Sequence, residues 1–361
     1  MFYTRLEIRL RGKMATVRVG VIGCGTMGKI HVNAFRKVGA EVAAVCDIDE
    51  KEVKYAREVL KIEHVYTDYH DLISRKDIDG VVVVTPNYLH YQMTIDALRE
   101  GKHVLCEKPP AISAKQVKEM FEASRKYGRK LLIGLTWRFR KLSSILRNYV
   151  LKGKIGEPYL IKAYMIRRAG IPGYGSWFTI KEQAGAGPLY DIGVHMLDLS
   201  LWIINDFKAK EVLASTYAKL GPKGLGKGTW GKPVPGGPFT VEDWAVAFIK
   251  MENGTTTILE AGWAGHISRG DYNVVIMGDK GGINYREASI YSEENGVLVD
   301  TKLEVGEEKP VENEARHFVN VILGKEEPLT KPEEMIMLQA ILEAALKSAE
   351  EKRLVKISEV L

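Results

Sequence analysis

The sequence predicts an α/β fold in which a doubly wound parallel sheet is followed by an α+β domain. Three observations support this prediction. From residue 17 onward, short β-branched runs alternate with helical patterns of about 10 to 15 residues. Some runs, such as Val81–Val84, are apolar throughout, which is typical of strands covered on both faces. After Trp137 the alternation ends, and strand patterns follow one another directly.

The first half of the chain contains six strand patterns separated by helical patterns. The strand patterns are 17–22, 41–46, 65–68, 80–86, 103–107 and 130–135. The helical patterns between them are 26–38, 50–61, 70–75, 88–101 and 113–128. Strands separated by helices form βαβ units, so we expect the six strands to be parallel.

The second half begins with one helical pattern, 141–154, and continues with longer, partly alternating runs. These runs are 158–168, 211–220, 242–251, 255–265, 272–278 and 282–286. Turn signals such as "ENGT" and "GDKGG" join some of them, which favours an antiparallel or mixed sheet. A last helix is expected over 332–350, with proline and acidic residues in its first turn. We therefore divide the chain into an extension, 1–13, and two domains, 14–137 and 138–361.

The composition is that of an ordinary globular protein, with 45% hydrophobic and 27% charged residues. The net charge is +6, but the excess lies in residues 1–13 and 221–240, which argues against an extended nucleic-acid face. No run approaches the roughly 18 apolar residues of a membrane span, and no signal peptide is recognisable, so we expect a cytoplasmic protein with no membrane partner. Cys24, Cys46 and Cys106 each follow an apolar run, which suits reduced, buried thiols.

A glycine-rich loop links the first strand to the first helix. Gly23, Gly25 and Gly28 form the pattern G-x-G-x-x-G where the strand ends, and Thr26 and Met27 lie inside it. Such a loop presents backbone N–H groups and a helix N-terminus to a pyrophosphate. A second copy at 226–231 has no strand before it and prolines after it, so only the first predicts a dinucleotide site.

The end of the second strand supports the same prediction. Asp47 follows the apolar run 41–46 and lies where an acidic residue bonds the adenosine ribose hydroxyls. A carboxylate there repels a 2′-phosphate, and the next residue, Ile48, offers no group to bind one. NAD is therefore favoured over NADP as the cofactor of the domain 14–137.

Two further strand ends carry unusual loops on the edge where ligands bind in a doubly wound sheet. One strand ends in Thr85-Pro86-Asn87 and another in Glu107-Lys108-Pro109. Pro109 disfavours helical geometry at Lys108, so the bend can direct the lysine toward a cofactor. Taken alone, Lys108 fits a surface lysine in a turn equally well.

The stretch "GAGPLYDIGVHMLDL", residues 185–199, predicts a buried helix that nevertheless carries Asp191, His195 and Asp198. At helical spacing these three side chains fall on one face. Buried ionisable groups are costly unless they are paired or used, so this face is a candidate site. The glycines before the helix allow the backbone to pass close to a ligand.

These motifs resemble the glucose-fructose oxidoreductase, inositol dehydrogenase and MocA (Gfo/Idh/MocA) family of NAD(P)-dependent oxidoreductases. The resemblance covers nearly all of residues 15–361 and rests on the first glycine motif, "TPN" at 85–87, "EKP" at 107–109 and the run ending in D-x-G-x-H-x-x-D. It implies an N-terminal Rossmann domain and a C-terminal α+β domain whose large, mostly antiparallel open sheet forms homodimers or homotetramers. It also implies a cis bond before Pro109. Tyr88, where many members have histidine, and Ala186, in place of a glycine, depart from the pattern.

The resemblance also implies the site residues. The catalytic group is Lys108, Asp191 and His195. The expected cofactor-binding residues are Gly23, Gly25, Thr26, Met27, Gly28, Asp47, Ile48, Thr85, Pro86, Asn87, His90, Glu107 and Lys108. The expected substrate-binding residues are Lys108, Arg138, Tyr164, Asp191 and His195, with Trp137, Arg167 and Trp177 as further candidates without a motif.

The residue types fit the oxidation of a secondary alcohol. His195 is the candidate base, because an imidazole titrates near neutral pH. Asp191 can orient the ring or bond a substrate hydroxyl, and Lys108 can stabilise a developing alkoxide. Asp198 can hold the far ring nitrogen of His195 or belong to a separate polar network. A metal bound by Asp191, His195 and Asp198 is disfavoured because Lys108 would oppose a cation, so no metal is expected.

The substrate implied by the resemblance is a sugar, polyol or cyclitol. The lysines of the loop 221–239 suggest a lid that favours an anionic sugar, but we favour a solvated connector. Two alternative functions share the fold: an NAD-dependent glycosidase that oxidises its substrate transiently, and a non-catalytic regulator that senses the cofactor. A regulator would be free to lose Lys108 and His195, and this chain keeps both.

Overall fold

The computed structural model describes residues 16–361, and the expected extension 1–13 lies outside the described residues. The first domain is built on a six-stranded parallel sheet, as the sequence predicts, and its strand order is β3-β2-β1-β4-β5-β6. Its strands are β1 (Arg18–Ile22), β2 (Glu41–Cys46), β3 (His64–Tyr66), β4 (Gly80–Val83), β5 (His103–Glu107) and β6 (Leu131–Gly134). The order reverses between β1 and β4, and ligands bind at such a switch point in doubly wound sheets.

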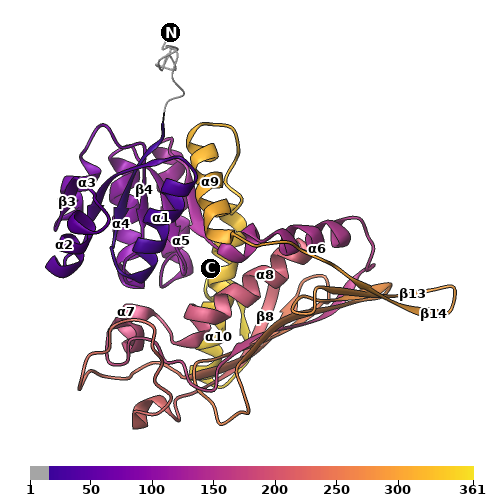
Figure 1. The fold of residues 1–361 in the computed structure, drawn as a ribbon. Coiled ribbons are helices and arrows are strands. Elements are labelled where there is room, and N and C mark those ends of the chain that lie inside the picture. Colours follow the sequence, from indigo (N-terminus) through magenta and orange to yellow (C-terminus); the bar gives the residue numbers. More distant parts are fainter. Residues whose placement is uncertain (1–15) are drawn as a thin grey trace.

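Helices cover both faces of this sheet (Figure 1). They are α1 (Thr26–Lys37), α2 (Glu50–Glu58), α3 (Tyr69–Ile73), α4 (Asn87–Arg99) and α5 (Ala114–Lys126). Val81, Val82 and Val83 are all fully buried, which explains their unbroken apolar run. Cys24, Cys46 and Cys106 are buried free thiols.

The second domain is built on a nine-stranded sheet of order β14-β13-β12-β11-β7-β10-β9-β8-β15. Its strands are β7 (Pro158–Ile166), β8 (Ala209–Tyr217), β9 (Trp244–Met251), β10 (Thr256–Gly262), β11 (Asp271–Gly278), β12 (Gly281–Asn284), β13 (Ser289–Glu294), β14 (Val297–Lys302) and β15 (Val355–Lys356). Only the β7 and β10 pair is parallel, so the expectation of a mostly antiparallel sheet is confirmed.

Helices lie on one face of this sheet, and Figure 1 shows the opposite face without a helix over it. The helices are α6 (Lys141–Leu151), α7 (Lys181–Ala184), α8 (Val194–Ile204) and α10 (Pro332–Glu351), the last of which was expected over 332–350. A π-helical turn, Leu189–Gly193, leads directly into α8. None of the helices within residues 16–361 is long and apolar enough to cross a membrane.

The chain returns to the first domain near its end. Helix α9 (Pro310–Ile322) packs against α1, and Figure 1 shows the two helices side by side. Gly80 of β4 lies directly under it, because a Cβ there would be 2.8 Å from the Ile322 side chain and 3.2 Å from Phe318. The second half of the chain therefore supplies part of the first core, which the pattern of strands and helices did not predict.

Candidate active site

The glycine loop between β1 and α1 fits a pyrophosphate. Gly23 has φ of +98°, and a Cβ on Gly28 would lie 2.0 Å from the Gly23 carbonyl oxygen, so both positions require glycine. A Cβ on Gly25 would meet no atom within 4 Å, so open space faces the start of α1. This helix begins with Thr26 and Met27, and no side chain from residues 16–361 caps it, so its N–H groups are available to an anion.

Asp47 is held at the end of β2, beside this loop. Its Oδ2 accepts a hydrogen bond from the Cys24 N–H at 2.6 Å and its Oδ1 accepts one from the Asp49 N–H at 2.9 Å. The side chain of Ile48 is 87% exposed, although it is apolar. These two residues fit the ribose and adenine end of a dinucleotide, for which the glycine loop fits the pyrophosphate.

The Thr85-Pro86-Asn87 and Glu107-Lys108-Pro109 loops lie beside each other because His90 connects them. Its ring is buried, with Nδ1 2.8 Å from the Pro109 carbonyl oxygen and Nε2 2.7 Å from the Thr85 carbonyl oxygen. Both nitrogens face protein atoms, so His90 braces the two loops and the expected direct contact with the cofactor is wrong. Asn87 is also buried, and its Nδ2 donates to the Ala184 carbonyl at 2.8 Å, which ties this loop to the second domain.

Lys108 meets Asp191 across the gap between the domains. Its Nζ donates to Asp191 Oδ1 at 2.9 Å and to the Asp191 carbonyl oxygen at 2.6 Å, and the bond before Pro109 is cis. The indole Nε1 of Trp263 donates to Asp191 Oδ2 at 2.8 Å. Burial raises the pKa of Asp191, but the charges of Lys108 and Arg167 and the hydrogen bonds from Lys108 and Trp263 together outweigh this effect, and the pKa is lowered. Asp191 is therefore an ionised carboxylate that orients Lys108, a contact that the sequence did not predict.

His195 lies one helical turn after Asp191, at the start of α8. Burial, together with the charge of Lys108, lowers its pKa to about 3, so the imidazole is neutral at physiological pH. Its Nδ1 is buried and has no hydrogen-bond partner among residues 16–361. A neutral imidazole has a free nitrogen that can accept a proton, and the Lys108 ammonium opposes the positive charge that this creates.

The Glu107 side chain holds the backbone N–H of Lys108. Its Oε1 lies 2.7 Å from His31 Nε2, and its Oε2 accepts the Lys108 N–H at 3.1 Å. Glu314 of α9 joins His31 and Glu107 in a buried group whose ligand atoms lie within 4.8 Å of one another. Because His31 and Glu107 already bond each other, this group fits a hydrogen-bonded pair that fixes the Lys108 turn.

Arg138 does not contact the site, so the expectation that it binds substrate is wrong. Its side chain is buried, donates to both oxygens of Asp198 and lies 2.6 Å from Glu334 Oε2. The charge on Arg138 thus serves to compensate two buried carboxylates. Of the two roles considered for Asp198, the separate polar network is the one observed, which also removes Asp198 from the metal-ligand set with Asp191 and His195.

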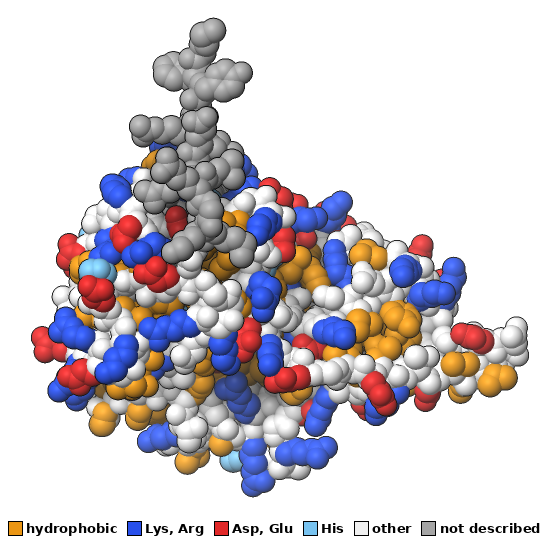
Figure 2. Space-filling view, turned by 45° about the horizontal axis from the view of Figure 1, so that its top comes forward, with side chains coloured by type: hydrophobic (Ala, Val, Ile, Leu, Met, Phe, Trp, Pro, Cys, Tyr) orange, Lys and Arg blue, Asp and Glu red, His pale blue; other side chains and the backbone are white. Residues whose placement is uncertain are grey.

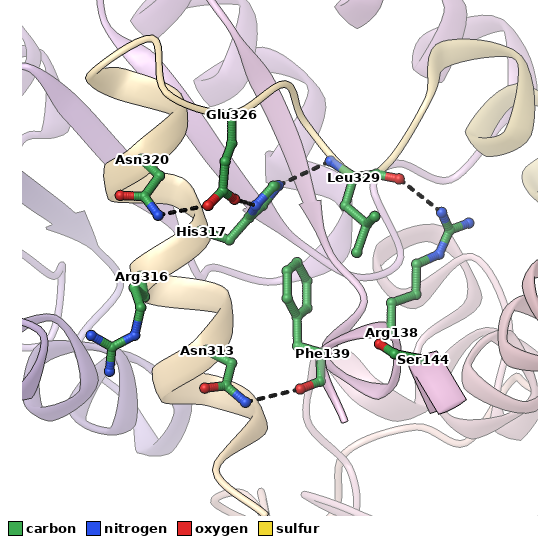
Figure 3. A pocket seen from close by; sticks show the side chains of 9 residues that line it. All are labelled: Arg138, Phe139, Ser144, Asn313, Arg316, His317, Asn320, Glu326 and Leu329. Atoms are coloured by element: carbon green, nitrogen blue, oxygen red, sulfur yellow. Dashed lines mark hydrogen bonds and ion pairs between the residues drawn. The ribbon is translucent and has the colours of Figure 1, made fainter. Parts of the chain in front are cut away.

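A cavity of about 270 Å³ lies beside Arg138, between α9 and the 3₁₀ turn Thr136–Phe139 (Figure 3). Its lining contains none of the three expected catalytic residues; it is formed by Arg138, Phe139, Ser144, Asn313, Arg316, His317, Asn320, Glu326 and Leu329. The Arg138 guanidinium donates to the Leu329 carbonyl at 3.1 Å on one side of it. The cavity is therefore separate from the candidate active site.

Tyr164 also lies away from the site, which corrects its assignment to substrate binding. On β7, Ile161 and Ala163 are buried under the helices, and side chains alternate along a strand. Tyr164 therefore points to the uncovered face, where its hydroxyl donates to Asp271 at 3.2 Å. The sequence did not indicate which face of this strand is covered.

Of the three further substrate-binding candidates, two have contacts or charges that reach residues of the site and one does not. The charge of Arg167 contributes to lowering the pKa of both Asp191 and His195, so it lies near the site. Trp177 packs against the cluster that contains Ile192. Trp137 packs edge-on against Tyr272, on the side of the domain with Arg138.

The loop 221–239, which was expected to be a solvated connector, is mostly exposed and is bonded to both domains. Its backbone pairs with residues 170–174, for example from the Ile171 N–H to the Gly226 carbonyl at 2.9 Å. Lys232 Nζ lies 2.9 Å from Asp49 Oδ2 and 2.7 Å from Glu52 Oε1, at the start of α2. The loop thus reaches the part of the first domain that follows Asp47.

A glycine loop at a helix start, an acidic residue after the second strand and a lysine facing a neutral histidine define a two-domain nicotinamide-dependent dehydrogenase acting on CH–OH groups. Comparison with known families agrees: the profile described as "Oxidoreductase family, NAD-binding Rossmann fold" matches residues 17–135, and the profile described as "GFO/IDH/MocA C-terminal domain" matches residues 144–284. The chain belongs to the Gfo/Idh/MocA family of oxidoreductases.

Individual relatives are similar over most of their length. D-glucoside 3-dehydrogenase of Escherichia coli (strain K12) is 34% identical over 340 residues, 92% of this chain and 95% of the relative. Myo-inositol 2-dehydrogenase of Thermotoga maritima is 27% identical, over 96% of this chain and all of the relative. The structure of levoglucosan dehydrogenase in complex with NADH and levoglucosan matches 95% of this chain with a TM-score of 0.81 at 22% identity, which is a likeness of fold.

Sequence reasoning missed Trp263 and the His31 and Glu107 pair. Trp263 is fully buried and lies just after β10, in a run that indicated only a strand. A tryptophan needs a partner for its N–H when buried, and this requirement was the one available signal. His31 lies three residues after the glycine motif, but nothing in the sequence pairs it with Glu107.

Proposed function

We propose that the protein is an NAD-dependent dehydrogenase that oxidises a secondary hydroxyl of a sugar, polyol or cyclitol. The observation that carries this proposal is the contact of Lys108 with Asp191 beside a neutral His195, at the carboxyl edge of the parallel sheet. The names of the relatives, which act on glucosides, inositol and levoglucosan, support the substrate class.

The proposed roles follow from the contacts. When bound, the nicotinamide ring supplies the hydride acceptor at C4, and the glycine loop with Asp47 holds the rest of the cofactor. His195 accepts the hydroxyl proton as the hydride leaves the same carbon. The Lys108 ammonium stabilises the negative charge that develops on the substrate oxygen, and Asp191 keeps that ammonium in place.

NAD rather than NADP is the proposed cofactor. Asp47 accepts two backbone hydrogen bonds and is therefore fixed as an acceptor for ribose hydroxyls. A carboxylate held in this position repels the 2′-phosphate of NADP. The expected homo-oligomer and cytoplasmic location also stay proposals.

The first experiment is a substitution of Lys108 by methionine, which keeps the length of the side chain and removes its charge. We expect turnover to fall by at least about a hundredfold with folding and NADH binding retained, the scale of one preorganised donor. The wild type and Lys108→Met are compared by NADH formation in a screen of glucosides, inositols and sugar acids, with NAD and NADP in parallel.

The exposed Lys115→Met variant is the matched control, because it removes a lysine charge elsewhere in the first domain. An unchanged rate in Lys108→Met contradicts the role assigned to Lys108. Substrate conversion without net NADH formation would instead favour the transient oxidation of a glycosidase. NADH binding without conversion of any substrate would favour a regulator.

A further inference from the structure

Glu242 lies two residues before β9, beside the start of the π-helical turn that carries Asp191 and leads into α8 with His195. Its side chain is buried, and its two carboxylate oxygens each accept one backbone hydrogen bond. Oε2 accepts the Gly187 N–H at 2.9 Å, and Oε1 accepts the Leu189 N–H at 3.1 Å. These N–H groups belong to the start of the π-helical turn, where the helix itself supplies no acceptor.

The hydrogen bonds continue from this contact to the reacting groups. The Gly187 carbonyl accepts the Asp191 N–H at 3.1 Å, and Asp191 in turn holds Lys108 through its carbonyl and its carboxylate. The Glu242 carboxylate thus holds the backbone at Gly187, and the Gly187 carbonyl in turn holds the N–H of Asp191. The position of Lys108 Nζ therefore depends on the contacts of Asp191 with Lys108 and on the contact of Glu242 with Gly187.

Asp243 is connected through Trp263 to the second carboxylate oxygen of Asp191. The Asp243 carbonyl accepts the Trp263 N–H at 3.0 Å, and the Trp263 indole donates to Asp191 Oδ2 at 2.8 Å. The pair Glu242 and Asp243 therefore reaches Asp191 by two separate routes, one through the backbone of Gly187 and one through Trp263.

The contact with Gly187 is too close for any other residue. A Cβ on Gly187 would lie 2.1 Å from the Glu242 carbonyl oxygen. The glycines before the helix were expected to bring the backbone close to a ligand. At Gly187 the backbone is instead close to Glu242, which indicates that this strand and the start of the helix are fitted to each other.

We propose that Glu242 is a positioning residue for the hydride-transfer site, which holds the start of the catalytic helix so that Asp191 presents Lys108 to the substrate. The inference rests on the proposed function, because it assigns Glu242 a role through Lys108 and Asp191. Glu242 itself contacts neither of them.

The ionisation of Glu242 gives this role a pH dependence. Burial raises its pKa to about 7, despite the two N–H donors and the charge of Lys181. Above pH 7 the carboxylate accepts both hydrogen bonds, and on protonation one oxygen becomes a donor that faces an N–H group. The nearby charged or titratable groups, from α7, the π-helical turn, β8 and α10, are Lys181, Tyr190, Tyr217 and Glu350.

Glu242 can exchange its proton without passing through the active site. It lines a cavity of about 270 Å³ together with Lys181, Gly185, Thr216, Tyr217, Ala218, Thr240, Val241, Leu346 and Glu350. Lys181 and Glu350 form an ion pair beside this cavity. His195, with a pKa of about 3, does not titrate near neutral pH, so an acid limb near pH 7 is assigned to Glu242.

The experiment measures kcat/KM against pH for the wild type, Glu242→Gln, Glu242→Asp and the exposed Glu182→Gln, a control with the same charge change on α7. We expect wild type and Glu182→Gln to lose activity as pH falls through about 7. Glu242→Gln should be lower by about tenfold to a hundredfold at pH 8, the cost of a small displacement of reacting groups, and should lack the acid limb. Glu242→Asp, which keeps the charge, should recover part of the activity and the limb.

A second measurement does not depend on activity. Hydrogen exchange followed by mass spectrometry should show faster exchange in peptides covering residues 185–195 of Glu242→Gln, and wild-type exchange in Glu182→Gln. An acid limb near pH 7 retained in a folded Glu242→Gln, or unchanged exchange in these peptides, overturns the inference. If Lys108→Met is fully active, the proposed function fails while the exchange result still decides whether Glu242 holds the helix.

Discussion

At the level of single residues, the site works by keeping one group neutral and its neighbours charged. His195 is neutral because burial and the Lys108 charge both oppose its protonation. Asp191 stays ionised because Lys108 lies 2.9 Å from its carboxylate. Asp191 is thus charged and His195 neutral, although only one helical turn separates them.

The neutral state of His195 has a consequence for stability. A histidine whose folded pKa is about 3 and whose ordinary pKa is 6.5 resists protonation only in the folded state. Stability is therefore lost as pH falls below about 6.5, by about 2 kcal/mol at pH 5. We expect the free energy of unfolding of wild type, relative to His195→Asn, to fall by about this amount between pH 7.5 and 5.

Chemical denaturation at the two pH values measures this difference, and His266→Asn serves as the control at an exposed histidine. A pH-independent difference between wild type and His195→Asn would mean that the folded state accepts the proton at His195 without cost. That result would contradict a buried, neutral imidazole beside Lys108.

The sequence predicted the residues of this site better than their contacts. Lys108, Asp191 and His195 were expected together because the resemblance to the family implies this group. Arg138 and Tyr164 were misplaced for different reasons. The two carboxylates that neutralise Arg138 come from distant segments, and the face to which Tyr164 points depends on which side of β7 the helices cover.

At the level of elements, buried ion pairs connect segments that are far apart in the chain. Arg138, from the turn after β6, bonds Asp198 of α8 and Glu334 of α10. All three are buried, so each charge depends on the others for compensation. The loop 221–239 makes a comparable but more exposed connection through Lys232 to the start of α2, where surface ion pairs contribute little.

Removing the arginine from the buried network should destabilise the protein strongly. Arg138→Met leaves two uncompensated carboxylates, and we expect it to lower the free energy of unfolding by about 3 to 5 kcal/mol. The measurement is chemical denaturation beside Arg316→Met, an exposed arginine that forms no ion pair among residues 16–361. A loss below about 1 kcal/mol, or a specific increase in KM in a stable Arg138→Met protein, would restore the case for substrate binding.

Many element boundaries were predictable, but strands β13 and β14 and helix α9 were not among the expected elements. Alternating strands and helices predicted the six parallel strands, and Pro332 with its acidic neighbours predicted the start of α10. Helix α9 has an ordinary amphipathic pattern that does not reveal its partner. Its Phe318 packs in the core of the first domain because Gly80 leaves room for it on β4.

At the level of the whole molecule, the parallel sheet and the mostly antiparallel sheet position different parts of the site. The parallel sheet presents its carboxyl edge to the cofactor, and the nine-stranded sheet carries α8 with Asp191 and His195 on its covered face. On the face in view in Figure 2, basic and acidic side chains are interspersed. The uncovered face of the nine-stranded sheet is the large surface that this arrangement leaves without a role.

This uncovered face carries apolar side chains in register. Leu213, Phe248 and Ile258 are cross-strand partners on β8, β9 and β10. Leu213 is 49% exposed and Phe248 43% exposed. Contiguous apolar side chains on a sheet surface mark an interaction site, and the resemblance implies assembly through this sheet.

We expect the protein to form homodimers or homotetramers through this face, and the paired variants Leu213→Glu and Phe248→Glu to dissociate them. A buried carboxylate without a partner opposes association, so the mass measured by light scattering should fall to that of one chain of 40.4 kDa. Leu298→Glu, at an 82% exposed position on β14 away from this row, should leave the mass unchanged. A monomeric wild type would contradict the expected assembly. Oligomers that persist in both sheet variants and dissociate in Leu298→Glu would place the contact at the β13 and β14 hairpin instead.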